Sequence, residues 1–266
     1  MLFKPKYLAG SFLVIVIAVS CFLLSSWQFS RLSERKELNK KISSRMKTEA
    51  VDISTLAKAD EESFINKYEY KRVKLEGKLV DKGTVLILGR SLDGDPGYNM
   101  MALLETKDKK LIYVNVGFLS TTLGEALSDG NATEKEAFTK LGDGKNYSFT
   151  ALIRKNETKG LFGSDMEVKK GKTTNRIDVK LFLTLVGDSK NRLEKEYWVQ
   201  LLKFDGEKNV DKYPDPIATP ELSEKNHLSY AIQWIFFGFT AIITWCVICF
   251  KASKRNRRLH SANIEK

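Results

Sequence analysis

Histidine and cysteine are scarce in this sequence, and their positions exclude several kinds of chemistry. Among 266 residues the only histidines are His227 and His260, and all three cysteines lie in apolar stretches near the two ends. The long middle region between the two apolar stretches, from residue 28 to residue 226, therefore cannot build a disulfide, a thiolate metal site, a cysteine nucleophile or a Ser-His-Asp triad. Its carboxylates show no spacing that singles one out. We therefore do not expect an enzyme.

Two of the cysteines, Cys246 and Cys249, have the spacing of some metal and redox sites. No second pair of ligands accompanies them, and they lie within an apolar run. We interpret them as small packing residues, with metal or redox chemistry as the alternative.

Charged residues are absent from two long apolar runs, Leu8–Ser26 and Tyr230–Phe250, and Gln233 is the only strongly polar side chain in the second. At 1.5 Å per residue, about 20 residues span a hydrocarbon core of about 30 Å. A single span must satisfy its own backbone hydrogen bonds, so both runs should be helices. The sequence therefore predicts a helical hairpin in a membrane.

A cleaved signal peptide is the alternative interpretation of the first run. Signal peptides have an apolar core of roughly 7 to 15 residues and a small-residue cleavage site, and this run is longer and lacks that site. Ala18–Cys21 faintly resembles a lipoprotein cleavage box, but Phe22–Leu24 continue the apolar run. An uncleaved anchor fits better.

Most of the net charge of +11 lies beside the two apolar runs rather than across the middle region. The flanking cations are Lys4, Lys6, Lys251, Lys254, Arg255, Arg257 and Arg258. Basic residues beside a span favour the cytoplasmic side. A second basic cluster, from Arg31 to Lys41, lies on the predicted external side, but long connecting segments cross largely regardless of charge. We therefore expect both termini in the cytoplasm and no nucleic-acid partner.

These observations predict five consecutive parts. They are a cytoplasmic N-terminus (1–7), a first transmembrane helix (8–27), a periplasmic β-rich domain (28–229), a second transmembrane helix (230–250) and a basic cytoplasmic tail (251–266).

Alternating polar and apolar residues predict strands in the middle region. The expected strands are Arg72–Glu76, Thr84–Leu88, Tyr98–Leu104, Leu111–Leu119, Tyr147–Arg154, Ile177–Val186 and Tyr197–Phe204. The fold class is thus a membrane α-hairpin of two transmembrane helices carrying an external α+β domain, mostly an antiparallel β barrel or sandwich.

Helical spacing continues beyond Trp27 to Ser43, and weaker helical patterns occupy Ser54–Ala59 and roughly Ser120–Leu141. Three of the five prolines, Pro214, Pro216 and Pro220, precede the second apolar run. We expect this segment to be a stiff, extended lead-in rather than a packed element.

The beginning of the second span gathers unusual side chains. On a helix, His227, Tyr230, Ala231 and Trp234 share one face. An imidazole can ligate haem iron, and aromatic faces can pack on the macrocycle. The ordinary alternative is an aromatic belt at the membrane interface.

The first span ends at the same depth with Trp27, Gln28 and Arg31. Two antiparallel helices would bring these groups to His227, and a guanidinium can pair with a propionate. The alternative for Arg31 is a long side chain that simply reaches to the membrane surface.

Three sequence blocks resemble the surfeit-locus-one family. They are Trp27-Gln28-x-x-Arg31 followed by Lys36, then Gly97-Tyr98 after Pro96, and finally Asn226-His227-Leu228-x-Tyr230-Ala231-x-x-Trp234. The likeness covers nearly the whole chain, and its specific parts are the two ends.

The resemblance implies an assembly factor for haem-copper cytochrome c oxidase that assists haem a delivery or insertion. It implies the oxidase catalytic subunit as partner, with haem a synthase as a further candidate, and haem a as a transient cofactor. His227 would then be the metal ligand, and Trp27, Arg31, Tyr230 and Trp234 would complete the cofactor site. Because no transit peptide rich in arginine and serine precedes the first span, we expect the bacterial inner membrane.

One block departs from the family pattern. The family's usual Asn-Arg-Gly-Trp segment is here Asn115-Val116-Gly117-Phe118, without the cation and the indole. Any partner contact that uses that arginine is therefore in doubt.

Two other function classes stay open. A haem-independent scaffold would dock on oxidase subunits through the β-rich domain. An envelope sensor would need signalling machinery inside the cell, and the tail of 16 residues after Phe250 is too short to fold as a domain.

Overall fold

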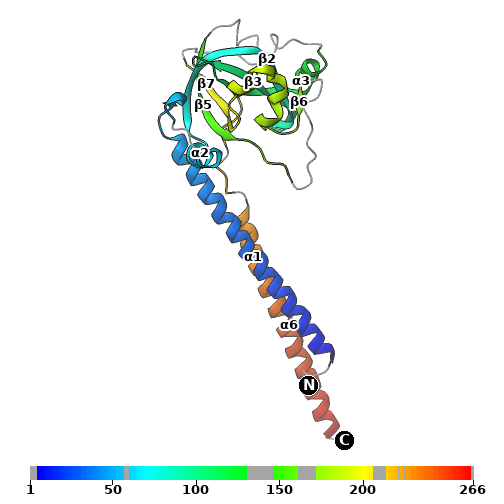
Figure 1. The fold of residues 1–266 in the computed structure, drawn as a ribbon. Coiled ribbons are helices and arrows are strands. Elements are labelled where there is room, and N and C mark those ends of the chain that lie inside the picture. The colour runs from blue at the N-terminus through cyan, green and yellow to red at the C-terminus, as the bar shows by residue number, and fades with distance from the viewer. Residues whose placement is uncertain are drawn as a thin grey trace. The chain divides into compact units, whose positions relative to one another are not determined.

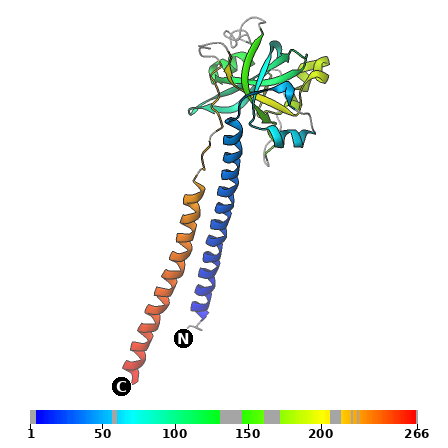
Figure 2. The same cartoon turned by 90° about the vertical axis from the view of Figure 1, so that its left-hand side faces the viewer.

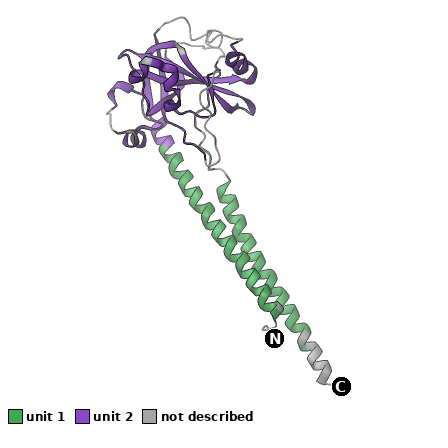
Figure 3. Ribbon diagram, turned by 45° about the vertical axis from the view of Figure 1, so that its right-hand side comes forward, with its two compact units in different colours: residues 1–41, 222–266 green, residues 42–221 purple. Residues whose placement is uncertain are grey.

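The computed structural model describes residues 5–56, 60–130, 146–160, 172–205, 214–220, 222–224 and 226–264. They divide into two compact units (Figure 3). The first comprises residues 1–41 and 222–266, and the second comprises residues 42–221. Helices build the first unit, whereas a β-sheet dominates the second.

The first unit is a pair of antiparallel helices that lie side by side (Figures 1 and 2). They belong to α1 (Pro5–Met46) and α6 (His227–Ile264), and both are long and apolar enough to cross a membrane. Large apolar side chains project outward from them: Phe12 is 71% exposed and Phe236 is 65% exposed. The core helix of a soluble protein would bury such residues, so this surface fits contact with lipid.

The two helices meet along a seam with a heptad pattern. On α1 the buried or half-buried positions include Ala18, Cys21, Ser25, Gln28, Leu32, Arg35 and Asn39. On α6 they include His227, Ala231, Trp234, Gly238, Ala241 and Trp245. Alternating steps of three and four residues keep one face of each helix toward its partner, as in coiled coils. Small side chains at several positions allow a close approach of the backbones.

A closed β barrel forms the core of the second unit. Its five main strands are β2 (Arg72–Leu92), β3 (Asp95–Thr106), β4 (Leu111–Ser120), β5 (Tyr147–Lys155) and β7 (Tyr197–Phe204). They pair in the order β2-β3-β4-β7-β5, and β5 pairs back onto β2. Apart from the parallel β4–β7 pair, these neighbours are antiparallel. The predicted fold class is therefore confirmed.

The first two predicted strands are one continuous strand, β2. It turns into β3 at Asp93 and Gly94, both with positive φ, so the turn is shorter than the dense run of turn residues suggests. The N-terminal half of β2 also pairs with β5, which closes the barrel. The short strands β1 (Val51–Asp52) and β6 (Thr173–Thr174) add to β2 in parallel.

Side chains from all five main strands fill one apolar core, and a second apolar core lies on the other face of the sheet. Strand β3 serves both, because successive side chains of a strand point to opposite faces. Met100, Ala102 and Leu104 join the first core, whereas Met101 and Leu103 join the second.

The predicted strand Ile177–Val186 is wrong. This segment forms η2 (Val179–Phe182) and α5 (Leu183–Val186), followed by η3 (Gly187–Arg192). Val179 and Phe182, three residues apart, are fully buried in the second core, and Phe182 meets Tyr113 edge-on at 4.9 Å. The segment thus covers the outer face of the barrel, which needs an apolar side but no strand pairing.

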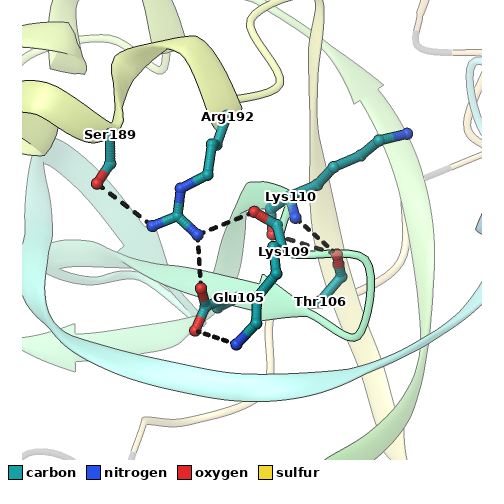
Figure 4. Close-up of polar contacts among 6 residues, drawn as sticks. All are labelled: Glu105, Thr106, Lys109, Lys110, Ser189 and Arg192. Atoms are coloured by element: carbon teal, nitrogen blue, oxygen red, sulfur yellow. Dashed lines mark hydrogen bonds and ion pairs between the residues drawn. The ribbon is translucent and has the colours of Figure 1, made fainter.

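A polar cluster ties the covering segment to the turn between β3 and β4 (Figure 4). The Arg192 guanidinium donates to Glu105 at 2.6 Å and to the Lys109 carbonyl at 3.1 Å. A second nitrogen of Arg192 is 3.3 Å from Ser189 Oγ, and the Lys109 ammonium lies 3.9 Å from Glu105.

Two helices complete the second unit. The helix α2 (Glu61–Tyr68) packs Phe64 on Tyr197 with ring centroids 5.0 Å apart, and the sequence analysis missed it. The predicted patch Ser54–Ala59 contains the end of η1 (Ile53–Thr55), and its residues 57–59 lie outside the described residues. Within predicted Ser120–Leu141, α3 (Thr121–Ser128) is helical, and residues 131–141 are not described.

The proline-rich segment is packed, contrary to the sequence-based expectation. Asp215 exchanges two main-chain hydrogen bonds with Phe118 on β4, at 2.7 and 2.9 Å. Gln200 Nε2 donates to the Ala218 carbonyl at 3.0 Å. A Cβ at Gly117 would lie 2.5 Å from Pro214 Cβ, so glycine there makes room for the segment.

Candidate functional site

His227 and Gln28 contact each other across the helix seam. His227 Nδ1 lies 2.9 Å from Gln28 Oε1, and both side chains are half-buried. An amide oxygen only accepts hydrogen bonds, so in this arrangement Nδ1 carries the proton. Nε2 contacts no donor or acceptor in the described part of the chain. The pair thus presents an imidazole whose Nε2 lone pair can bind a metal ion.

Packing of the seam fixes the position of this pair. One helical turn into the apolar run, the buried Ser25 hydroxyl donates to the Ala231 carbonyl at 3.0 Å. Near the other end of the hairpin, Trp245 Nε1 donates to Ser11 Oγ at 3.0 Å. These two contacts fix the register of the helices, so the imidazole is held by more than its own hydrogen bond.

Residues 222–224, which precede α6, bind the part of α1 that follows Gln28. They lie on the other side of the His227–Gln28 pair from the apolar run. Arg35 Nε donates to the Ser223 carbonyl at 2.9 Å, and Asn39 Nδ2 lies 3.2 Å from the Leu222 carbonyl. Lys36, part of the first sequence block, lies 3.8 Å from the Glu224 carboxylate. These contacts bind residues 222–224 to α1 before α6 begins at His227.

Of the other proposed site residues, Trp27, Arg31 and Tyr230 lie beside the seam, whereas Trp234 lies on it. Trp27 and Tyr230 are about half exposed, at 51% and 49%. The Arg31 guanidinium lies 5.7 Å from the Trp27 ring centroid and 2.7 Å from the Glu34 carboxylate. Trp234 is half-buried and meets Phe237 edge-on at 6.0 Å.

The structure therefore brings His227 together with Gln28 and brings Trp27 together with Arg31. The sequence analysis noted Gln28 but gave it no role in the site. The signal that could have identified it is the heptad phase of Ala18, Cys21 and Ser25, which places position 28 on the seam and position 27 beside it. Among the described residues, no group of three or more histidine, cysteine or acidic side chains is arranged to hold a metal ion. A metal at His227 would thus need ligands from another molecule.

The central sequence blocks lie in the barrel. Tyr98 on β3 packs on Gly124 of α3, where a Cβ would lie 2.1 Å from the Tyr98 ring. Burial, followed by the negative charges of Glu125 and Asp129, raises the pKa of Tyr98. At Gly97 a Cβ would lie 2.5 Å from the Phe118 ring. The absence of a side chain at Gly97 therefore lets β3 pack closely against β4.

The block that departs from the family pattern is buried. Val116 belongs to the first core, and Phe118 pairs with Asp215 of the proline-rich segment. Asn115 lies between β3 and β7 and is 2% exposed. Two apolar side chains thus stand where the resemblance leads one to expect an arginine and a tryptophan.

Comparison with known proteins gives one consistent family. The model of the SURF1 family matches residues 15–239, which include His227 and its neighbours. A SURF1-like protein of Dictyostelium discoideum is 33% identical over 117 residues, which is 42% of this chain and 43% of that protein. The aligned stretch thus spans less than half of that relative.

Mycobacterial relatives match along nearly the whole chain. An uncharacterized SURF1-like protein of Mycobacterium tuberculosis is 23% identical over 259 residues, covering 97% of this chain and 88% of the relative. An uncharacterized SURF1-like protein of Mycobacterium bovis matches with the same identity and coverage.

Proposed function

The chain belongs to the SURF1 family, and from this membership we propose that it is an assembly factor for haem-copper cytochrome c oxidase that assists haem a delivery or insertion. It would act by binding, as a chaperone of the oxidase catalytic subunit, and not as an enzyme. The observation that carries the cofactor part of the proposal is the His227–Gln28 contact at 2.9 Å.

The imidazole fits the role of an axial ligand. Haem a, when bound, supplies an iron that imidazole nitrogens ligate. Gln28 holds the tautomer in which Nε2 keeps its lone pair, as partners of metal-bound histidines usually do. Apart from His260, His227 is the only histidine in the sequence, so the chain would offer the iron one imidazole ligand at this site.

The neighbouring side chains fit a planar, anionic group. Trp27 and Tyr230 leave about half of their surface uncovered, so their rings can pack on a macrocycle. Arg31 can exchange Glu34 for a propionate at little cost, because both partners are about half exposed and such pairs contribute roughly 0 to 1 kcal/mol. Trp234 would complete the apolar wall one turn deeper.

The proposed location is the bacterial inner membrane, with the barrel in the periplasm and both termini in the cytoplasm. Two candidate spans and the basic residues after Phe250 support it. In this arrangement the His227 site lies at the periplasmic surface of the membrane. The catalytic subunit and haem a synthase are the proposed partners there.

Purification in mild detergent from cells that make haem a tests the proposal. We expect a haem absorption spectrum and co-purification of the oxidase catalytic subunit. His227→Ala should remove the spectrum while the subunit still co-purifies, and Ser229→Ala, a change at an exposed position of the same turn, should change neither. An unchanged spectrum in His227→Ala would exclude the ligand role.

A haem-independent scaffold is the second candidate. The Gln28–His227 pair and the Arg31–Glu34 pair already satisfy polar groups within the hairpin, which supports a purely structural role for them. Purified protein that carries oxidase subunits without any haem would favour this alternative.

A further inference from the structure

A cavity of about 530 Å³ in the barrel unit carries an excess of positive charge. The cations that line it are Arg90, Arg154, Lys155, Lys159 and Arg176, and the carboxylates are Glu69 and Glu157. Arg176 also pairs with Asp178 at 2.9 Å, but the positive side chains in the wall still outnumber the negative ones, and this excess favours an anionic ligand.

Arg154 is held rigidly in the wall of this cavity. Its guanidinium lies 5.1 Å from the Tyr70 ring centroid and 5.3 Å from the Trp198 ring centroid. Its Nη1 donates to Gln200 Oε1 at 2.6 Å, and Gln200 is 2% exposed. Two aromatic contacts and one short hydrogen bond fix the guanidinium in advance, so little rotamer entropy is lost when a carboxylate binds to it.

The carboxylates described in the wall of this cavity form no ion pair with Arg154. Glu157, one of the two carboxylates in the wall, accepts from Arg90 at 2.7 Å and from the Ile177 amide at 2.9 Å. In the described ranges no carboxylate forms an ion pair with Arg154. A half-buried guanidinium without a counter-ion is a strong binding position for a carboxylate, because such hydrogen bonds are charge-assisted and often bidentate.

The backbone at Tyr70 is held in a sparsely populated conformation. Its φ is 65°, in the left-handed region that bulky residues avoid. Main-chain bonds from Tyr70 to the Ile153 carbonyl at 2.8 Å and from Lys71 to the Tyr68 carbonyl at 2.9 Å maintain it. This conformation positions the Tyr70 ring on Arg154, and strain of this kind concentrates at binding sites.

A second cavity of about 420 Å³ adjoins the first, since both are lined by Lys155–Lys159 and Arg176. Its wall adds Ile65 and Asn66 of α2, and it is lined by four cationic and four acidic side chains, so its charges balance. The two cavities together form a trough with one cationic end and one neutral, partly apolar end. A single small anion would fill only a part of it.

We propose that this trough binds an extended acidic segment of a partner polypeptide, with a carboxylate of that segment paired to Arg154. The proposal goes beyond the oxidase assembly role and does not depend on haem. A failure here would leave the His227 experiment unaffected, and the reverse also holds.

The test measures fluorescence anisotropy of a labelled peptide of alternating glutamate and serine, added to the full-length protein in detergent. We expect saturable binding that is lost with the twin peptide in which glutamine replaces glutamate. Arg154→Gln should weaken binding by about tenfold or more, the scale of one charge-assisted hydrogen bond. Lys74→Gln, at an exposed position of β2, should change it by less than about twofold.

The comparison of the two peptides on the unaltered protein needs no variant, so it stays decisive if Arg154→Gln folds poorly. Arg154→Lys keeps the charge but not the planar fork, and we expect intermediate binding. Equal binding of both peptides would overturn the proposal. The proposal would also fail if inorganic phosphate displaced the peptide when both supply the same concentration of negative charge. The site would then bind free anions rather than a polypeptide segment.

Discussion

Ser25 and Ala231 are joined by a hydrogen bond of 3.0 Å between the two long helices, and Ala231 is completely buried. The small Ala231 side chain lets α6 approach α1 closely enough for the Ser25 hydroxyl to reach a main-chain carbonyl. His227 is one helical turn away on the same seam. The close approach at Ala231 therefore supports the position of the candidate ligand.

Ala231→Leu should separate the helices at this point. Inserting a large side chain into a packed interface typically costs about 1 to 3 kcal/mol. We expect a lower melting temperature of the detergent-solubilised protein, measured by circular dichroism. Ile232→Leu is the control, because Ile232 is 57% exposed on the neighbouring face and should melt like the wild type. Equal melting temperatures for both variants would show that the seam does not pack at Ala231.

Gly117→Ala should release the proline-rich segment from β4. The added Cβ would lie 2.6 Å from the Asp215 carbonyl oxygen, and φ at Gly117 is 153°, which side chains rarely adopt. Backbone strain of this kind costs about 1 to 3 kcal/mol. We expect faster proteolysis next to Asp215 and a melting temperature lowered by several degrees.

Gly160→Ala is the matched control for this change. A Cβ at Gly160 meets nothing within 4 Å, so the substitution should leave both measurements unchanged. If Gly117→Ala behaved like Gly160→Ala, the pairing of Phe118 with Asp215 would not contribute to stability.

The hairpin and most strands could be predicted because each rests on a local pattern. An uncharged run long enough to cross a membrane as a helix can be recognised without the rest of the chain. The same holds for a strand pattern such as that of Leu111–Leu119. The error at Ile177–Val186 arose because apolar residues alternated there by chance. Its true pattern is the three-residue spacing of Val179 and Phe182, which only the position of the second core makes visible.

Features that depend on distant partners could not be predicted. The pairing of β5 with β2 closes the barrel, but the sequence of neither strand alone indicates this pairing. The helix α2 did carry a local signal that was overlooked, since Asp60 caps the amide of Ser63 and Phe64 and Tyr68 are four residues apart. At the candidate site the sequence alone indicated His227. Its partner Gln28 could be identified only once it was known which positions of α1 face α6.

The stability of the barrel unit should depend on pH through Glu105. The hydrogen bond from Arg192 holds the pKa of Glu105 below its ordinary value, and the Lys109 charge acts in the same direction. A lowered pKa in the folded state stabilises the fold above the ordinary carboxyl pKa of about 4.3, and this contribution is lost as the pH falls through the lower folded value. Glu105→Gln should therefore lower the melting temperature at pH about 7. In acid the melting temperatures of the variant and the wild type should become equal.

Asp108→Asn in the same turn provides the comparison, since Asp108 is exposed and is not among the described partners of Arg192. Its melting curve should follow the wild type across the pH range. A constant difference between Glu105→Gln and the wild type down to pH about 3 would show that Glu105 does not act through its charge.

The proposal that the chain serves the assembly of a haem-copper oxidase rests on its membership of the SURF1 family. Its most direct test is the oxidase activity and haem a content of membranes from cells that lack this chain, with the wild-type chain restored as the reference. We predict that both fall together in its absence and return with the wild-type chain. Oxidase activity and haem a content that stay at the reference level without the chain would contradict the account.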